Sequence, residues 1–323
     1  MMYEQRLLEL LKTNLSPNTS LNDAIVTALD ISYDAAHRRT SGKSKLSLEE
    51  SVRLAKYYDL SLDRLFENTQ ENIIAVEKTK TIDSESELKE YFDTSFESLK
   101  PLLNQKDSHI LYSAKDLPLF YTLENNTLSR FKMFVWLKLL DPTMSDKGFE
   151  SFSLKVETIE SAKALGGLYK NLNTSEIWDI TTINSTLKQI DFYYEAGHLD
   201  TTTALQLCDE LQTLVTSISI QVVPKNEKYL FYYNELLLMN NNVLVTTPQK
   251  QSLFVPFTIL SYYQTSDKKT CQEAEVFLTK QLQSSKLLNT AGEKEKRSFF
   301  NKLHSKIEAL QQLIKASQVL NFE

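Results

Sequence analysis

Apolar residues recur at helical spacing through the first 69 residues and divide that stretch into short amphipathic segments. The segment 3–13 places three leucines on one face. A capping box at 47–50 opens a helix that runs to Tyr58, and Ser61 caps a last short helix. With the two helices described next, the pattern predicts a five-helix domain.

Two short helices joined by a tight turn are predicted between residues 20 and 45. The apolar stripe of the first helix ends at Asp30, and Ser32 is a good N-cap for a second helix through Ala36. Gly42 follows that helix, where a residue with positive φ is favoured. This pattern is typical of a helix-turn-helix, whose second helix can lie in the major groove of DNA.

The segment 35–48 contains no Asp or Glu, although the chain as a whole is acidic. Residues 1–69 carry 9 Lys and Arg against 10 Asp and Glu, and the formal net charge of the chain is −6. Only the local distribution of charge therefore favours a polyanionic partner. The cations gathered there are Arg38, Arg39, Lys43 and Lys45, beside His37. Such a segment can dock on phosphates by counterion release; the alternative is a solvated charged helix face.

Residues 3–67 resemble the λ-repressor-like (Cro-type) helix-turn-helix domain. Asn22 stands where that family often has a phosphate-contacting Gln, and Ile31-Ser32 matches its turn. Ala36 matches its buried recognition-helix position, and Arg38–Gly42 matches its basic exit.

Two positions depart from that family. Asp30 replaces the usual turn glycine, and Asp adopts the left-handed conformation at modest cost. Val26 replaces a smaller residue in the first helix of the motif, which bears on the angle between the two helices.

The resemblance implies a set of DNA-binding residues. Those expected to face the groove are Ser32, Tyr33, Asp34, His37, Arg38 and Ser41; those expected near phosphates are Asn22, Lys43, Lys45 and Ser47. Arg38 is suited to a bidentate contact with guanine, Asp34 to accepting from a cytosine amine, and Tyr33 to a thymine methyl or a phosphate. Arg39 ranks below Arg38 because it can turn inward over the domain. An exposed His such as His37 is most often simply solvated.

Composition bounds the rest of the chain. At 323 residues, 41% hydrophobic and 10% aromatic, it is long enough for two or three globular domains. Only 6 glycines are present, so no Gly-rich phosphate loop or nucleophile elbow is expected, and large α/β enzyme folds are disfavoured. The 2 cysteines and 4 histidines lack metal-ligand spacing, so no metal, no cofactor and no catalytic residue are predicted. The sequence contains no long apolar run, so no membrane-spanning segment is expected.

A polar stretch at 70–84 is interpreted as a linker between an N-terminal domain, 1–69, and a larger mainly helical domain, 85–323. The helices predicted in the larger domain are 85–104, 127–140, 157–172, 180–196, 200–217, 256–264, 268–286 and 293–318. A small antiparallel β-sheet is predicted from Tyr229–Met239 and Val243–Thr247, with Leu253–Val255 as a candidate third strand. The predicted fold class is mainly α.

Two patterns in the larger domain have alternative interpretations. Most aromatic residues lie beyond residue 70, where a large aromatic core is favoured over a ligand pocket. Near the C-terminus an a/d pattern fits either a dimer seam or docking on the chain's own domain. Its members are Phe300, Leu303, Ile307, Leu310 and Ile314.

These patterns favour a cytoplasmic, sequence-specific DNA-binding transcription regulator, and the layout resembles bacterial regulators of the helix-turn-helix class. The expected partners are double-stranded DNA and a second copy in a homodimer, with a small-molecule or protein effector bound by the larger domain and no membrane. The alternative is an interaction or scaffold protein whose helix-turn-helix binds a protein partner. An enzyme is disfavoured, because no nucleophile, base or metal site is recognisable.

Overall fold

The chain folds into two compact units, residues 1–75 and residues 76–323, described here in turn. The structure is a computed structural model, and it describes residues 3–16, 19–60, 62–65, 74–144, 147–236 and 241–320.

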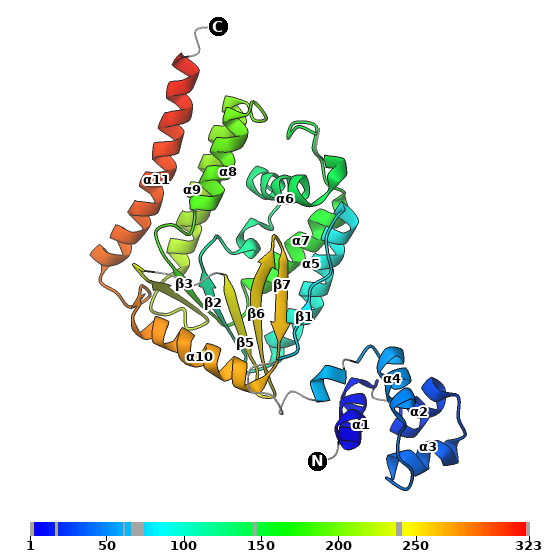
Figure 1. Cartoon of the computed structure of the whole chain (residues 1–323). Helices are drawn as coiled ribbons and strands as arrows, with labels where there is room; N and C mark the ends of the chain where they lie inside the picture. The colour runs from blue at the N-terminus through cyan, green and yellow to red at the C-terminus, as the bar shows by residue number, and fades with distance from the viewer. Residues whose placement is uncertain are drawn as a thin grey trace. The chain divides into compact units, whose positions relative to one another are not determined.

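Unit 1 is helical throughout its described part (Figure 1). Its elements are α1 (Tyr3–Asn14), α2 (Leu21–Leu29), α3 (Tyr33–Thr40), α4 (Leu48–Tyr57) and the short 3-10 helix η1 (Leu62–Leu65). A small apolar core joins these helices, formed by Leu8, Leu11, Ile25, Ala28, Leu29, Ala36 and Leu54. Four α-helices and one 3-10 turn therefore occupy the region predicted as five helices, while the predicted cap Ser61 lies outside the described residues.

Local capping signals set the helix boundaries in unit 1. The side chains of Ser20, Ser32 and Ser47 accept from backbone N–H groups at the starts of α2, α3 and α4. Glu50 completes the capping box of α4. Asp30 ends α2 in the left-handed conformation, with φ 56° and ψ 51°. The expectation that Asp can replace the turn glycine is therefore confirmed.

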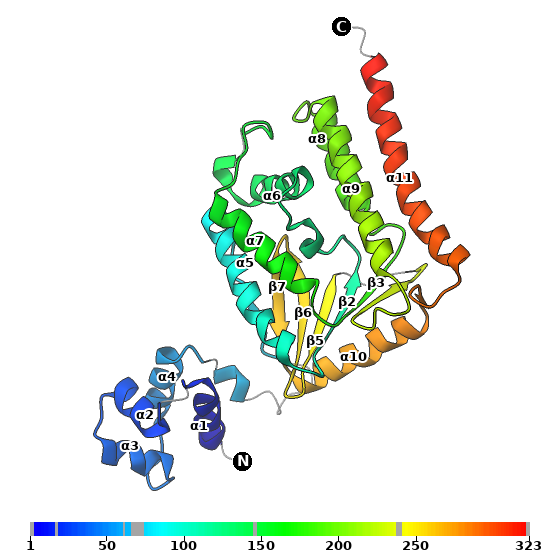
Figure 2. The ribbon, with the colours of Figure 1, turned by 180° about the vertical axis from the view of Figure 1, so that it is seen from behind.

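Unit 2 is built on an eight-stranded mixed sheet with strand order β1-β7-β6-β5-β2-β3-β4-β8 (Figures 1 and 2). The strands are β1 (Glu77–Lys78), β2 (His109–Ala114), β3 (Thr174–Trp178), β4 (Tyr229–Tyr233), β5 (Asn242–Thr246), β6 (Gln251–Thr258), β7 (Ser261–Thr265) and β8 (Lys286–Leu287). The strands β2, β3 and β4 are parallel neighbours, and the other pairs are antiparallel.

Helices cover both faces of this sheet. The α-helices of unit 2 are α5 (Glu85–Leu99), α6 (Thr127–Leu140), α7 (Val156–Tyr169), α8 (Asn184–Glu195), α9 (Thr201–Gln221), α10 (Lys268–Gln283) and α11 (Glu293–Leu320). The short 3-10 helices are η2 (Lys100–Asn104), η3 (Leu119–Thr122) and η4 (Pro142–Met144). One face of the sheet joins the large core, in which residues of α5 to α9 and α11 are buried. Leu111, Ile177 and Leu244 point to the other face, where they meet Cys271 and Leu278 of α10.

The predicted small antiparallel sheet is wrong in size and in pairing. The strands β4 and β5 correspond to the two predicted runs, but they do not form a hairpin: β4 pairs with β3 and β8, whereas β5 pairs with β2 and β6. The parallel strands β2 and β3, which were not predicted, lie between them. Parallel strands are buried on both faces, so they lack the alternation that marks a half-exposed strand.

The helix predicted at 256–264 is also wrong, because that segment is the hairpin of β6 and β7. Leu260 turns the chain there with a φ of 58°. Phe257 and Tyr263 pack across the hairpin with ring centroids 4.5 Å apart. Aromatic and β-branched residues favour such cross-strand contacts, which outweighed the local helical spacing of the apolar residues.

The segment expected to be a linker is divided between the two units: residues 74 and 75 belong to unit 1, and residues 76–84 belong to unit 2. Glu77–Lys78 forms β1 and pairs with β7, and Ile82 is buried in the large core. The residues 76–84 therefore form the start of the larger unit and are not part of a linker between two domains.

The C-terminal a/d residues pack within the chain itself. Phe300, Leu303, Ile307, Leu310 and Ile314 of α11 are all buried in the large core. The helices α9 and α11 lie side by side in both views (Figures 1 and 2). Of the two interpretations of this pattern, docking on the chain's own domain is confirmed, and the apolar stripe is not free to form a dimer seam.

Candidate nucleic-acid interface

Helix α3 buries one side against unit 1 and presents the other side outward. Ala36 is fully buried against the small core. Tyr33, Asp34, His37 and Arg38 are exposed, and 55% of Tyr33 remains accessible. A residue as large as Tyr at that exposure is available for an intermolecular contact.

Three of the predicted contact residues are cations without a partner in the described part of the chain. Arg38, Lys43 and Lys45 are exposed and make no side-chain hydrogen bond or ion pair there. The loop that carries the two lysines is held to the end of α3, because the Ser44 backbone N–H donates to the Arg38 carbonyl at 2.9 Å. Helix and loop therefore present these cations from one connected segment.

Arg39 has the opposite environment. Its guanidinium pairs with the Glu50 carboxylate through Nε and Nη2, and Nη1 donates to the Ala35 carbonyl at 2.9 Å. The hydrogen bond from Arg39 lowers the pKa of Glu50, and the Ser47 backbone N–H lowers it further. The placement of Arg39 inward over the domain is confirmed, which leaves Arg38 as the arginine that faces outward.

Asn22 connects both ends of α3 to α2. Its Nδ2 donates to the Tyr33 hydroxyl at 3.2 Å, and its Oδ1 accepts from the Thr40 hydroxyl at 2.7 Å. Thr40 was not among the predicted residues, although it lies two helical turns after Tyr33 and so shares its face. These bonds orient the Tyr33 ring and fix the angle between the two helices.

The three predicted serines have capping roles. The hydroxyl of Ser32 accepts from Ala35 N at 3.3 Å, and that of Ser47 accepts from Glu50 N at 3.1 Å. A hydroxyl that accepts from the backbone can still donate its own proton to a phosphate. The hydroxyl of Ser41 instead donates to the His37 carbonyl at 2.6 Å, so only its lone pairs are available.

Two other kinds of site are absent from the described residues. No helix there is long and apolar enough to cross a lipid bilayer. No three His, Cys, Asp or Glu side chains come together there as they would around a metal ion. Cys208 and Cys271 are buried free thiols, and burial raises the pKa of both, that of Cys208 to about 12.

The N-terminal part of the chain matches a known family. A family model described as the BetR domain matches residues 1–84. This is a helix-turn-helix-like DNA-binding domain family of transcription regulators. The match spans unit 1 and ends at Ser84, the N-cap of α5. No curated protein and no solved structure matches the chain.

Proposed function

We propose that this protein is a sequence-specific DNA-binding transcription regulator whose helix α3 enters the major groove, as in the λ-repressor-like domains that residues 3–67 resemble. The observation that supports this most directly is the segment from Arg38 to Lys45, which lacks acids and presents three exposed cations, Arg38, Lys43 and Lys45, that have no partner within the described residues. The BetR-domain match over the same unit points to the same class of function.

Contacts to DNA divide into those that position the protein and those that read bases. Arg38 projects from α3 and is suited to the O6 and N7 atoms of guanine, while Asp34 can accept from a cytosine amine. Lys43 and Lys45 follow α3 in the loop, where a flexible point charge suits a phosphate. Tyr33, oriented by Asn22, is suited to a thymine methyl.

The test begins with selection of bound fragments from random DNA by the full chain. Affinity for the selected site is then measured over a salt series. We expect Arg38→Ala to lose about 1 to 3 kcal/mol and to relax the preference at one base position. Lys43→Ala should weaken binding to all sequences alike and lower the salt slope by about one.

The control variant is Lys12→Ala, which removes an exposed cation from the last turn of α1. It should leave both the affinity and the base preference unchanged. Wild-type affinity in both Arg38→Ala and Lys43→Ala would show that the docking surface is misplaced. Weak binding with little dependence on salt would favour the alternative, in which the helix-turn-helix contacts a protein partner.

Unit 2 supplies the remaining parts of the proposal: homodimerisation and the binding of a small-molecule or protein effector, in the cytoplasm of a bacterium. Its action is through binding rather than catalysis. The support for a sensor role is that unit 2 is a separate compact body with its own large core and a cavity of its own. An effector would act by binding one arrangement of the two DNA-binding units better than another.

A further inference from the structure

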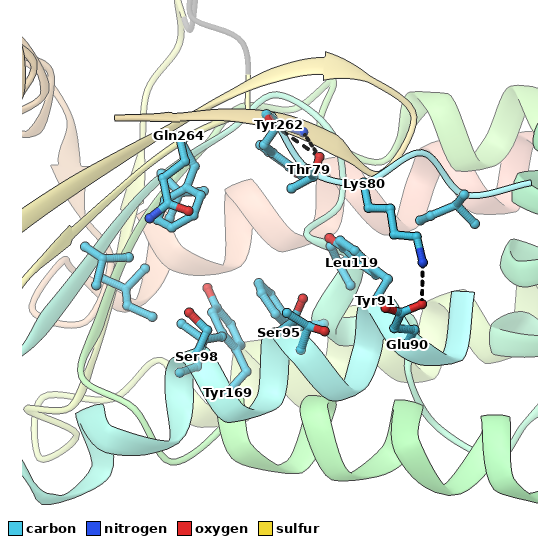
Figure 3. A pocket seen from close by; sticks show the side chains of 18 of the residues that line it. Thr79, Lys80, Glu90, Tyr91, Ser95, Ser98, Leu119, Tyr169, Tyr262 and Gln264 are labelled. Carbon is cyan, nitrogen blue, oxygen red and sulfur yellow. Dashed lines mark hydrogen bonds and ion pairs between the residues drawn. The ribbon is translucent and has the colours of Figure 1, made fainter. Parts of the chain in front are cut away.

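A cavity of about 250 Å³ lies inside unit 2, between α5 and the sheet (Figure 3). Its floor is the face of β2, β5, β6 and β7 that belongs to the large core, and its opposite wall is α5. Apolar and aromatic side chains make up most of its lining, among them Leu99, Ile110, Tyr112, Phe120, Tyr169 and Tyr262. Most of the lining surface is therefore apolar.

Two of the tyrosines present ring surface rather than a free hydroxyl. The Tyr169 ring stacks on Phe120 with centroids 4.0 Å apart and planes 6° from parallel, and its hydroxyl donates to Glu176 at 2.6 Å. Tyr112 is buried, and its pKa is raised well above the ordinary value by burial and by the neighbouring Tyr262 hydroxyl. Both side chains stay neutral and offer flat surfaces on which a planar molecule can stack.

Polar groups without a partner face each other across this space. Gln264 points from β7 toward α5, and Ser98 stands on the side of α5 that faces the sheet (Figure 3). Neither side chain makes a hydrogen bond within the described residues, and both line the cavity. A primary amide both donates and accepts, so Gln264 can satisfy one polar group of a ligand in either role.

Charged side chains at the cavity are confined to one end, where one lysine lies beside two carboxylates. Lys80 pairs with Glu90 at 2.7 Å and lies 3.9 Å from Glu87 (Figure 3). All three belong to the segment 80–90. An anionic ligand would lose its hydration without meeting an unpaired cation in the described lining. A cationic ligand would meet no carboxylate without partners there, because Glu90 pairs with Lys80 and Glu87 accepts from the Asp83 N–H at 2.9 Å.

We propose that this cavity binds a small uncharged molecule with a planar, mostly apolar body and one hydrogen-bonding group that Gln264 and Ser98 recognise. A dry cavity of about 150 Å³ holds benzene, so a cavity of this size suits a bicyclic molecule of about ten non-hydrogen atoms. Every wall belongs to unit 2, so the inference is independent of DNA binding.

The test uses the full chain and three matched probes: 2-naphthol, naphthalene and 2-naphthoate, measured by calorimetric titration. We expect 2-naphthol to bind, naphthalene to bind up to about tenfold more weakly because it forms no hydrogen bond, and 2-naphthoate to show no measurable binding. Failure of 2-naphthol to bind, or equal affinity for 2-naphthoate, would overturn the proposal.

Variants locate the binding within the cavity. Ser98→Trp fills the space from an exposed position on α5 and should abolish binding of 2-naphthol, whereas Glu97→Trp adds the same side chain to α5 outside the lining and should leave it unchanged. Gln264→Leu keeps the shape and should reduce 2-naphthol to the affinity of naphthalene. If Ser98→Trp still binds 2-naphthol, the ligand does not occupy this cavity. If Gln264→Leu keeps the wild-type ratio of the affinities for 2-naphthol and naphthalene, Gln264 does not recognise the polar group. Circular dichroism confirms that each variant is folded.

Discussion

The two adjacent arginines of α3 differ because only one of them reaches a carboxylate. Arg39 lies within reach of Glu50, which also closes the capping box of α4, so the same carboxylate fixes a helix start and neutralises a cation. Arg38 lies about 100° further round the helix and meets no such partner in the described residues. The sequence shows four cations in this segment, but the structure leaves three of them free for an anionic partner.

Lys132 of α6 is a buried ammonium group held by neutral partners. Its Nζ donates to Gln189 Oε1 at 2.7 Å and to the Thr186 hydroxyl at 3.3 Å, and Trp136 lies beside it. Burial lowers its pKa to about 8, and Asp116 offsets only part of this effect. No carboxylate lies within ion-pair distance of Lys132 in the described part of the chain.

This environment predicts a specific pH dependence of stability. Because the pKa of Lys132 is about 8 in the folded state against 10.5 for the ordinary side chain, the unfolded state binds more protons between these values. The free energy of unfolding therefore rises with pH over this range. Above the unfolded pKa the folded protein bears no cost for a buried charge at Lys132, and as the pH falls through the folded pKa it bears the full cost. The cost of the buried charge at neutral pH is about 3 kcal/mol at most.

We expect Lys132→Met to be more stable than the wild type at about pH 7 and to lose this advantage by about pH 10. Urea unfolding of both proteins across that range measures the difference between their free energies of unfolding. Groups that titrate alike in both proteins cancel in this difference. Leu139→Met, an exposed apolar position on the same helix, serves as the control and should leave the pH dependence of the wild type unchanged. A difference between Lys132→Met and wild type that does not change with pH would contradict the argument.

At the scale of elements, the sequence predicted what is encoded locally and missed what depends on distant partners. The caps at Ser32 and Ser47 are visible in the sequence because a capping side chain and the N–H that it accepts from are three residues apart. For the same reason the outward-facing positions of α3 follow from the helix start. The partner of Asn22 at Thr40 was not predicted, because it depends on how two helices pack.

The strand β3 shows where prediction from the local sequence fails. Its sequence, Thr-Ser-Glu-Ile-Trp, reads as polar, yet all of it is buried. The Glu176 carboxylate accepts from the Tyr121, Tyr169 and Tyr229 hydroxyls and from the Trp178 indole N–H. Burial nevertheless raises its pKa. Tyr121 and Tyr229 lie more than 50 residues from Glu176 in the sequence, so the local sequence does not mark the carboxylate as an interior residue.

The helix α11 provides a prediction at this scale, because its apolar stripe packs inside unit 2. Ile307 is fully buried there, and Ile307→Ala should cost about 2 to 5 kcal/mol of the free energy of unfolding. The control is Glu308→Ala, an exposed neighbour that should change stability little. Denaturant unfolding of the full chain measures both. If the stripe instead formed a dimer seam, Ile307→Ala would raise the dimer dissociation constant in sedimentation, which we do not expect.

At the scale of the whole molecule, the boundary between the two units, at residues 75 and 76, separates two kinds of structural feature. Unit 1 carries the exposed cationic segment, and unit 2 carries the large core and the cavity. The segment 79–82, which lines that cavity, lies only a few residues after the division. A ligand in the proposed site would contact the part of the chain that leads to unit 1, which offers a covalent route for coupling the two units.

A single unit of this size buries too little surface for tight specific DNA binding, so the proposed regulator needs a second copy. We expect the full chain to form a two-fold dimer through unit 2 and to select a palindrome whose half-sites lie about 10 base pairs apart, one helical turn. A fragment of residues 1–75, checked for helicity by circular dichroism, should bind the same DNA far more weakly and should be insensitive to half-site spacing. Inserting about 5 base pairs between the half-sites turns them to opposite faces of the duplex and should abolish the advantage of the full chain. Analytical ultracentrifugation with and without DNA measures the stoichiometry directly, and a full chain that stays monomeric in both conditions would contradict the dimer.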